Sequence, residues 1–232
     1  MWQTTKGLSG FALKLIAMLS MTIDHVGYVL YENAYWMRVV GRMAMPLYAF
    51  LLCEGFSHTQ NRKRYCLRLA FFAMLSEPAF DLAISGRLID WGTQNVFFTL
   101  LLGLLALCSF EKKTTLALPV ALCAALVAEL MRTDYGFAGV WLILMMGRAG
   151  RNRRRIAAGM VVFCLWFTLP PIIDALANGA WEQLPMALVQ WFGMAAIWPI
   201  CHYNGERGVL PRWGGLLLYF YYPLHLLVIS VL

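Results

Sequence analysis

The sequence predicts an all-α fold, a polytopic integral membrane bundle of about nine transmembrane helices, made by a single domain over residues 1–232. Of the 232 residues, 61% are hydrophobic and only 13% are charged, and the mean hydropathy is +0.64. Soluble domains are usually about 45–50% apolar and about 25% charged. The apolar excess runs along the whole chain, which excludes a soluble domain with one anchor.

Short connections separate the apolar stretches, each of which is long enough or nearly long enough to be a span. A hydrocarbon core about 30 Å thick needs about 20 helical residues. The sixth stretch is short, so its full crossing stays open and a total of eight spans is the alternative. The first stretch lacks a small-residue cleavage site, so it is predicted to be a retained span. In order, the predicted spans are 11–31, 35–57, 65–85, 94–110, 114–131, 135–148, 155–175, 183–201 and 213–232.

Basic residues gather in every second connection between the predicted spans. Lys and Arg mark the cytoplasmic side of a membrane protein, so the N-terminus and the even-numbered connections are predicted to face the cytoplasm. The odd-numbered connections carry Glu32, Arg87, Asp90, Arg132, Asp134 and Glu182, and the even-numbered ones Arg62, Lys63, Arg64, Lys112, Lys113, Arg148, Arg151, Arg153, Arg154, Arg155, Arg207 and Arg212.

The net charge of +7 is explained by this orientation and by contact with anionic membrane lipids. A phosphorylated cofactor bound at the basic connections is the alternative. No basic face sits on a soluble domain, so no nucleic-acid partner is expected. The six cysteines are scattered singly without Cys/His ligand spacing, so no metal site is expected.

Three ionisable residues lie in the first predicted span. Lys14 and His25 are eleven residues apart, about three helical turns, so they fall on one face about 16 Å apart. Asp24 directly precedes the histidine. An unpaired charge at the bilayer centre costs roughly 2.5–3.5 kcal/mol on insertion scales. These side chains are therefore expected to face the bundle interior or a water-filled cavity.

Polar residues of other spans fall at a similar predicted depth, in the outer half of the membrane. Arg38 and Arg42 lie four residues apart on one face of the second span. Glu77 and Asp81 lie four residues apart in the third span, where Pro78 can free backbone carbonyl groups. Asp134 is predicted on the outer surface. We expect one polar cavity in the outer half, lined by Asp24, His25, Arg38, Arg42, Glu77, Asp81, Asn95 and His225.

Each of these residues also has a structural explanation. The two arginines could be interfacial side chains that extend to the headgroups, and the two carboxylates of the third span could be their ion-pair partners. Those carboxylates could instead share a proton or act as acid and base. Each histidine could be a hydrogen-bonded interhelical residue, and Lys14 could anchor the inner interface.

These residues resemble a known family. The stretches IDHVG, GRMAMPLYAFLLCEG and DYG in this order, with the YYPLHLL tail, closely resemble the TraX family of bacterial membrane proteins, over about residues 11–150 and the tail. That family is associated with N-acetylation of conjugative pilin and is similar to transmembrane acyltransferases that use cytoplasmic coenzyme A. In one branch of those enzymes a Lys/Arg-x10-His pattern carries the essential histidine, and Lys14 and His25 match it. Pro223 and His225 resemble the end of related acyltransferases, whereas residues 155–212 match no motif.

The resemblance implies acetyl transfer from acetyl-CoA. His25 is the candidate general base or covalent acyl carrier, Asp24 is expected to set its tautomer, and Arg42 is expected to stabilise the oxyanion with Arg38 or Asn95. The residues expected to contact the coenzyme are Lys14, Arg38, Asn95 and His225, and the supporting carboxylates are Glu77, Asp81 and Asp134.

The predicted protein is therefore a multi-pass protein of the bacterial cytoplasmic membrane. Its expected partners are membrane lipids and an acceptor peptide or glycan, while the acceptor, the acyl chain length and the oligomeric state, including a homo-oligomer, stay open. The alternative is a small transporter or an assembly factor whose buried charges form a pathway, although no broken-helix pair or inverted repeat favours a transporter. A purely structural membrane subunit is a third hypothesis.

Overall fold

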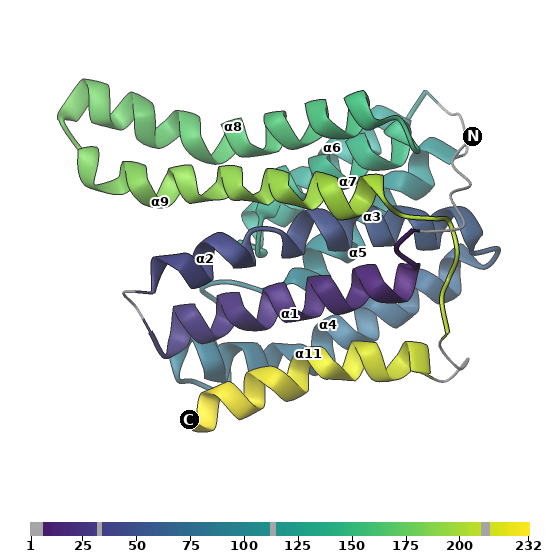
Figure 1. Cartoon of the computed structure of the whole chain (residues 1–232), viewed down its shortest axis with the longest axis horizontal. Helices are drawn as coiled ribbons and strands as arrows, with labels where there is room; N and C mark the ends of the chain where they lie inside the picture. The colour runs from purple at the N-terminus through teal and green to yellow at the C-terminus, as the bar shows by residue number, and fades with distance from the viewer. Residues whose placement is uncertain (1–6, 32–33, 112–114, 210–213) are drawn as a thin grey trace. The chain divides into compact units, whose positions relative to one another are not determined.

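The computed structural model describes residues 7–31, 34–111, 115–209 and 214–232 (Figure 1). Apart from turns and two isolated β-bridges, the regular structure of these residues is helical. The described helical segments are nine in number and follow the order of the nine predicted spans, which confirms the all-α membrane fold. The predicted connection residues Glu32, Lys112, Lys113 and Arg212 lie outside the described residues.

Seven of these segments are single helices, and the second and eighth are composite. In chain order they are α1 (Gly10–Val29), α2 (Tyr35–Gly41) with α3 (Ala44–His58), α4 (Arg62–Ser85), α5 (Val96–Glu111), α6 (Ala117–Leu130), α7 (Gly136–Ala149), α8 (Arg153–Asn178), the run η1 (Trp181–Gln183), α9 (Leu184–Val189), η2 (Gln190–Ala196) and α10 (Ile197–Cys201), and α11 (Gly214–Val231).

Segment length divides the helices into two groups. Four segments are long and apolar enough to cross a membrane, namely Gly10–Val29, Tyr35–His58, Arg153–Asn178 and Trp181–Cys201. The helices α5, α6, α7 and α11 are apolar but shorter. Helix α7, the short sixth span of the prediction, has 14 residues, which extend about 21 Å at 1.5 Å per residue.

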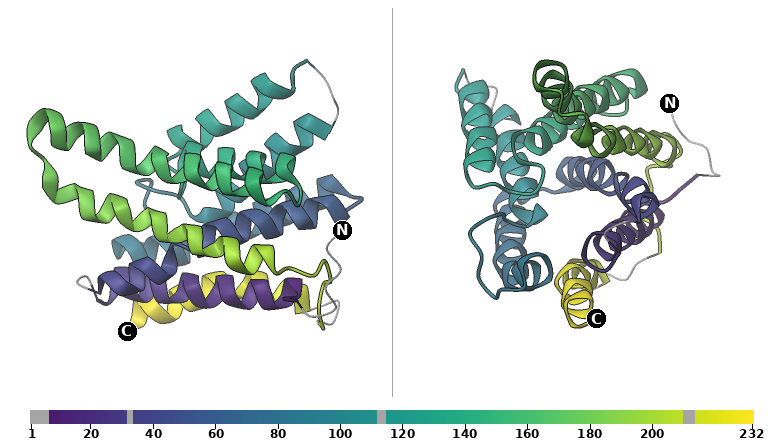
Figure 2. Two further views of the ribbon diagram at one scale, coloured as in Figure 1. Left: turned by 45° about the horizontal axis from the view of Figure 1, so that its top comes forward. Right: turned by 90° about the vertical axis from the view of Figure 1, so that its left-hand side faces the viewer.

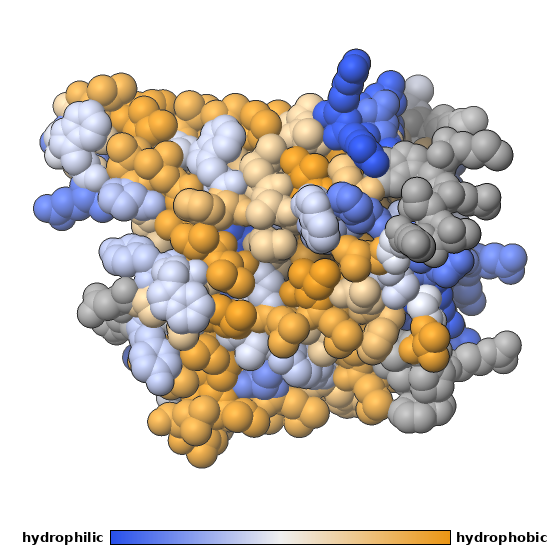
Figure 3. Space-filling model, in the orientation of Figure 1, coloured by the Kyte–Doolittle hydropathy of each residue, from blue (hydrophilic) through white to orange (hydrophobic). Residues whose placement is uncertain are grey.

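Large apolar side chains remain exposed on the outer faces of the helices. Ile173 and Leu176 on α8 are 63% and 71% exposed, and Phe71 and Met74 on α4 are 58% and 73% exposed. Apolar residues cover much of the face of the molecule that Figure 3 shows. Contact with lipid tails explains this exposure, because such a surface would be unfavourable in water.

The chain forms two compact units, each assembled from segments far apart in the sequence. Unit 1 comprises Met1–Tyr48 and Ala149–Gly208, and unit 2 comprises Ala49–Arg148 and Val209–Leu232. Unit 1 thus holds α1, α2, the start of α3, and the segments from α8 to α10. Unit 2 holds the rest of α3, the helices α4 to α7, and α11.

In unit 1, two glycines let α1 and α2 approach closely. A Cβ added to Gly27 would lie 2.5 Å from Cβ of Met37, and one added to Gly41 would lie 2.1 Å from Oδ1 of Asp24. Any larger residue at either position would push the helices apart. The other pair in this unit is α8 with the segment from α9 to α10, which run side by side in Figures 1 and 2.

The basic connection that contains Arg151 and Arg153 lies at one end of unit 1. The N–H of Gly10, at the start of α1, donates to the carbonyl oxygen of Glu206 at 2.8 Å, and the guanidinium of Arg153, at the start of α8, donates to the carbonyl oxygen of Cys201 at 3.4 Å. The Arg151 guanidinium also lies at this end. The starts of α1 and α8 and the end of α10 therefore share one end, as the positive-inside rule requires of connections on one side.

An aromatic cluster holds the helices of unit 2 together. The ring of Phe72 on α4 lies 4.9 Å from that of Tyr219 on α11 and 6.2 Å from that of Phe97 on α5, centroid to centroid. The same Phe97 ring lies 5.1 Å from Tyr222, three residues further along α11. These contacts fix the register of α11 against α4 and α5.

Unit 2 also has a basic end. Arg62, at the start of α4, pairs with Glu111 at the end of α5, with Nη2 to Oε1 at 2.8 Å. The hydrogen bond from Arg62 lowers the pKa of the Glu111 carboxyl below its usual value. The Arg148 guanidinium, near the end of α7, lies 4.9 Å from the ring centroid of Phe110. The end of α4 and the starts of α5 and α7 therefore lie toward the opposite end of this unit.

Candidate functional site

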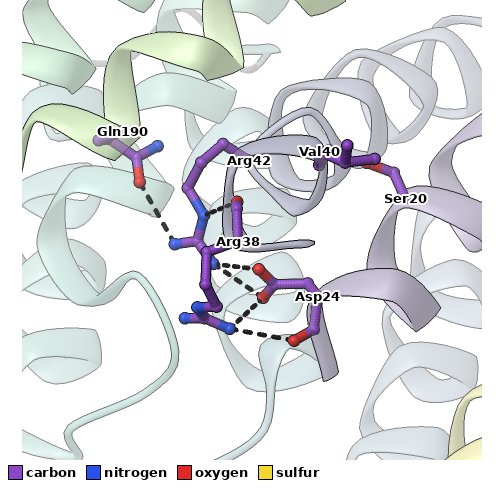
Figure 4. Close-up of polar contacts among 6 residues, drawn as sticks. All are labelled: Ser20, Asp24, Arg38, Val40, Arg42 and Gln190. Carbon is purple, nitrogen blue, oxygen red and sulfur yellow. Dashed lines mark hydrogen bonds and ion pairs between the residues drawn. The ribbon is translucent and has the colours of Figure 1, made fainter. Parts of the chain in front are cut away.

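Asp24 is the centre of a buried ion-pair cluster in unit 1 (Figure 4). The residue is only 8% exposed. Nη2 of Arg42 donates to both carboxylate oxygens at 2.7 Å, and Nη1 of Arg38 lies 2.8 Å from Oδ2. The Arg38 guanidinium also donates to the backbone oxygen of Asp24 at 3.2 Å and lies 4.9 Å from the ring centroid of Tyr28. Two guanidinium groups thus meet one carboxylate.

These contacts favour one of the two explanations for the arginines. The side chains of Arg38 and Arg42 are 19% and 14% exposed, so they are held inside unit 1 and do not extend to headgroups. Their carboxylate partner is Asp24, which lies on the same helix as His25. The two carboxylates of the third span have other partners, in unit 2.

A break in the second helical segment positions Arg42. Helix α2 ends at Gly41 and α3 begins at Ala44. Pro46 has no amide hydrogen, so it cannot donate to the carbonyl of Arg42 four residues earlier. Gly193 approaches that carbonyl so closely that an added Cβ would lie 3.0 Å from the Arg42 oxygen. The proline and the glycine together let η2 pack against the interruption that carries Arg42.

Gln190, the first residue of η2, extends this cluster. Its Oε1 lies 3.5 Å from Nη1 of Arg42, and the residue is 5% exposed. Its Nε2 is buried, and no described residue accepts a hydrogen bond from it. Arginine can only donate, so the amide oxygen must face Arg42. A buried donor without an acceptor costs about 1–3 kcal/mol, so Gln190 is unfavourable for folding by itself.

Polar contacts anchor η2 to α8. The indole Nε1 of Trp191 donates to Oγ1 of Thr168 at 3.0 Å, and the thiol of Cys164 lies 3.5 Å from the carbonyl oxygen of Gln190. A 3₁₀ stretch of seven residues is longer than usual. The anchors hold this stretch so that Gln190 faces the arginine cluster.

His25 and Lys14 lie on one uninterrupted helix, α1, and both are half-buried. Their same-face spacing of about 16 Å therefore holds, because the helix is regular between them. Both oxygens of the Asp24 carboxylate bond the arginines. The described role of Asp24 is thus to hold the two guanidinium groups, and its role in setting the His25 tautomer stays a prediction.

A second polar cluster, in unit 2, joins α4 to the start of α5. The Asn95 amide nitrogen donates to the carbonyl oxygen of Ala73 at 2.8 Å and to Oε2 of Glu77, and its Oδ1 accepts from the N–H of Phe97 at 2.9 Å. These bonds use both amide hydrogens of Asn95, which is fully buried. Asn95 therefore caps α5 and ties it to α4, and a bound coenzyme would have to break one of these bonds.

The other acidic residues of unit 2 also stabilise connections. Oδ2 of Asp81 accepts from the N–H of Asp90 at 2.8 Å, which fixes the connection between α4 and α5. The Thr99 hydroxyl donates to the carbonyl oxygen of Asp134. Two residues near this aspartate carry positive φ angles: Arg132, two positions before it, with +52°, and Tyr135, directly after it, with +66°. Such angles are rare in non-glycine residues and mark local strain.

His225 lies on α11 in unit 2 and is 7% exposed. Its ring stacks on that of Tyr221, with centroids 5.2 Å apart, and Nδ1 lies 3.0 Å from the Tyr221 carbonyl oxygen. Tyr222 packs against Phe97 near the start of α5, so His225, one turn further, lies toward the Asn95 end of the unit. This agrees with its predicted depth.

The structure thus brings the predicted site residues together in two groups. Unit 1 contains Lys14, Asp24, His25, Arg38 and Arg42, and unit 2 contains Glu77, Asp81, Asn95, Asp134 and His225. In unit 1 the cluster of Asp24, Arg38 and Arg42 lies away from the basic end, whereas Lys14 lies near the start of α1, toward that end. The residues predicted to line one cavity belong to both units, so that cavity stays a prediction.

The sequence interpretation missed Gln190. Residues 155–212 match no motif, so this segment received no site residue. The available signal was a single amide within the apolar run LPMALVQWFGMAAIW, because a polar residue in a membrane span needs a partner or a function. In the described part of the chain, no group of three or more His, Cys, Asp or Glu side chains is arranged to hold a metal ion.

Comparison with known proteins gives the family. The family described as "TraX protein" matches residues 9–232. The chain is 30% identical to a probable fimbrial assembly protein FimC of Dichelobacter nodosus, over 94% of the chain and 93% of that protein. It is 26% identical to the protein TraX of Escherichia coli, over 95% of the chain and 85% of that protein. No solved structure matches the chain.

The match includes residues 155–212, where no motif was found, as well as the stretches that carry the resemblance. It therefore confirms the predicted family and extends it over the segment that supplies Gln190. This chain belongs to the TraX family of membrane proteins.

Proposed function

We propose that this protein is a membrane-embedded acetyltransferase, which moves the acetyl group of acetyl-CoA to an amine or hydroxyl of an acceptor peptide or glycan. The observation that carries the proposal is the buried cluster of Asp24, Arg38 and Arg42, whose carboxylate directly precedes His25 in α1. It combines a titratable imidazole with fixed cationic donors, which is what acyl transfer from a thioester needs.

In the proposed reaction His25 acts on the acceptor. As general base, the imidazole takes a proton from the acceptor amine or hydroxyl, whose nitrogen or oxygen then forms a bond to the thioester carbonyl carbon. The carbon–sulfur bond breaks, and the coenzyme A thiolate takes the proton back from the imidazolium. In the alternative, His25 itself accepts the acetyl group before the acceptor does.

Arg42 is the proposed donor to the oxygen that becomes negative during this step. Asp24 holds Nη2 of Arg42, and Nε of the same side chain donates to the carbonyl oxygen of Arg38 at 3.3 Å. A guanidinium fixed on two sides needs little reorganisation when charge develops. The positive charge of the guanidinium group favours an anionic transition state in the same way.

Lys14 and the basic connections would attract the phosphates of coenzyme A from the cytoplasmic side. This proposal places the protein in the bacterial cytoplasmic membrane with its N-terminus in the cytoplasm, where acetyl-CoA is available. The names of the relatives, TraX and a fimbrial assembly protein, make a pilus subunit the first acceptor to test. Membrane lipids are the other expected partners.

A second candidate function is assembly of a surface fibre without acetyl transfer. The observation that favours it is the name of the relative from Dichelobacter nodosus, a probable fimbrial assembly protein. In that case the buried charges would only hold helices together or form a charge pathway. Turnover of acetyl-CoA separates the two functions.

The test is release of coenzyme A from acetyl-CoA by the purified full-length protein in lipid nanodiscs, with and without an acceptor peptide. Release should be read by mass spectrometry, because the six free cysteines would react with a thiol reagent. His25→Ala should reduce turnover by about 10²- to 10⁴-fold, the usual effect of a general base. His58→Ala is the matched control, since that side chain is 68% exposed and lies at a helix end.

Two outcomes contradict the proposal. Failure of the wild-type protein to release coenzyme A under any acceptor condition favours the assembly function. Full turnover by a folded His25→Ala variant removes His25 from the chemistry.

A further inference from the structure

We propose that Gln190 is a further catalytic residue, whose Nε2 donates a hydrogen bond to the acyl carbonyl oxygen of the donor thioester together with Arg42. This inference rests on the proposed acetyl transfer. It gives a role to the segment from α9 to α10, which carries no motif. It also names a carbonyl oxygen as the ligand group that Nε2 of Gln190 bonds.

The first support is the unused donor. Nε2 of Gln190 is buried without a described acceptor, although the residue is only 5% exposed. Its orientation is fixed, because Oε1 must face the guanidinium of Arg42 at 3.5 Å. In a planar carboxamide one N–H lies almost parallel to the C=O bond, so one hydrogen of Nε2 points to the same side as Oε1. A ligand carbonyl oxygen placed there can accept from both Nε2 and the Arg42 guanidinium.

The second support is the backbone that holds Gln190. Trp191 bonds Thr168 on α8, and Gly193 packs against the Arg42 carbonyl where the second segment is interrupted. The carboxamide and the guanidinium are thus attached to backbones that are in direct contact. Two donors held on fixed elements, in a site away from water, are the arrangement that stabilises an oxyanion (Figure 4).

A structural role for Gln190 makes a different prediction. If its only function were to position Arg42 through Oε1, any acceptor at that place would serve. If its function were packing, a side chain of equal length would serve. Gln190→Glu keeps an acceptor toward Arg42 and removes the donor, and Gln190→Met keeps the length and removes both polar groups.

The experiment measures kcat and KM for acetyl-CoA hydrolysis, without acceptor, by the full-length wild type and both variants in nanodiscs, together with the thermal unfolding midpoint. We expect kcat to fall about 10²- to 10³-fold in both variants, with KM within about threefold. We expect the unfolding midpoint of Gln190→Met to be unchanged or higher, since the variant removes an unpaired buried donor. Gln183→Met, at an exposed position of η1, is the matched control.

Several outcomes overturn the assignment. Wild-type kcat in Gln190→Glu would show that only the acceptor toward Arg42 matters, and wild-type kcat in Gln190→Met would show that packing suffices. Unchanged hydrolysis with a raised KM for an acceptor peptide would move the contact to the acceptor. Each of these removes the inference and leaves the acetyltransferase proposal intact, whereas failure of the wild type to release coenzyme A under any acceptor condition removes both.

Discussion

Gly41 of α2 lies directly against Asp24 of α1, so closely that a Cβ at position 41 would stand 2.1 Å from Oδ1 and 2.3 Å from Cβ of the aspartate. The smallest side chain at this position therefore collides with the residue that holds both arginines. Close packing of α1 on α2 and the ion-pair cluster are for this reason one structural feature. A substitution of Gly41 should therefore displace the Asp24 carboxylate.

We predict that Gly41→Ala displaces the Asp24 carboxylate and lowers the free energy of unfolding by about 3–5 kcal/mol, the usual effect of breaking a buried ion pair. Thermal unfolding in detergent measures it. Gly10→Ala is the matched control, because its nearest contact would be 3.4 Å. An equal unfolding midpoint for the two variants would contradict the prediction.

The second prediction compares a buried ion pair with an exposed one. Asp24→Asn leaves Arg38 and Arg42 without a carboxylate among their described contacts in a largely buried site, so it should lower the free energy of unfolding by about 3–5 kcal/mol. Glu111→Gln removes the partner of Arg62 at the basic end of unit 2, where the glutamate side chain is 47% exposed. Solvent screens surface ion pairs, so this loss should be clearly smaller than that of Asp24→Asn.

Chemical denaturation of both variants gives these two values. Arg42→Met should be milder than Asp24→Asn, because Asp24 keeps its bond to Arg38. The combined Asp24→Asn, Arg42→Met variant should show a coupling energy of about 0.5–3 kcal/mol. Strict additivity would mean that the two side chains do not interact in the folded protein.

The helices of this protein could be predicted from its sequence because lipid imposes a simple rule on each span. Nine apolar stretches of suitable length became nine described segments in the same order. The break between α2 and α3 was not predicted, although Pro46 lacks the amide hydrogen that would continue the helix. A missing amide hydrogen can bend, kink or interrupt a helix, and the outcome depends on what packs there, which in this case is Gly193 from a distant part of the chain.

The candidate site could be predicted less completely. Depth along a span follows from residue number, so the sequence correctly indicated that Asp24, Arg38 and Arg42 lie at one level. The depth of an arginine in the membrane does not determine which carboxylate it pairs with. Two arginines four residues apart could pair with any carboxylate at that level. The close contact of α1 with α2, at Gly27 against Met37 and at Gly41 against Asp24, selects Asp24. Gln190 comes from a helix whose neighbours the sequence does not name.

The third prediction concerns the capping role of Asn95. Asn95→Ala removes the acceptor for the Phe97 N–H and both donors toward α4. Loss of an N-cap costs about 1 kcal/mol, and the Glu77 carboxylate and the Ala73 carbonyl would lose a buried hydrogen bond as well. A total loss of about 2–4 kcal/mol is therefore expected from chemical denaturation.

Asn61→Ala is the control for this effect. Asn61 caps α4 in the same way, through a bond from the N–H of Arg64 at 2.9 Å, but it is exposed. Its loss should stay near the cap value of about 1 kcal/mol. Hydrogen exchange should also quicken at the start of α5 in Asn95→Ala, and unchanged protection there would contradict the assigned role.

The last prediction uses the strained connection before α7. Arg132 is exposed and has a φ of +52°, a conformation that glycine adopts without steric cost. Arg132→Gly keeps the backbone hydrogen bond from Gln94 to the carbonyl oxygen of residue 132 and relieves the strain. It should raise the free energy of unfolding by about 0.5–1 kcal/mol, after the entropic cost of glycine is subtracted.

Arg87→Gly is the control for this prediction. Arg87 lies in an exposed connection of the same unit and has no positive φ, so its replacement should lower the free energy of unfolding by a similar amount. Equal signs for the two changes, measured by thermal unfolding, would show that the φ of Arg132 stores no strain.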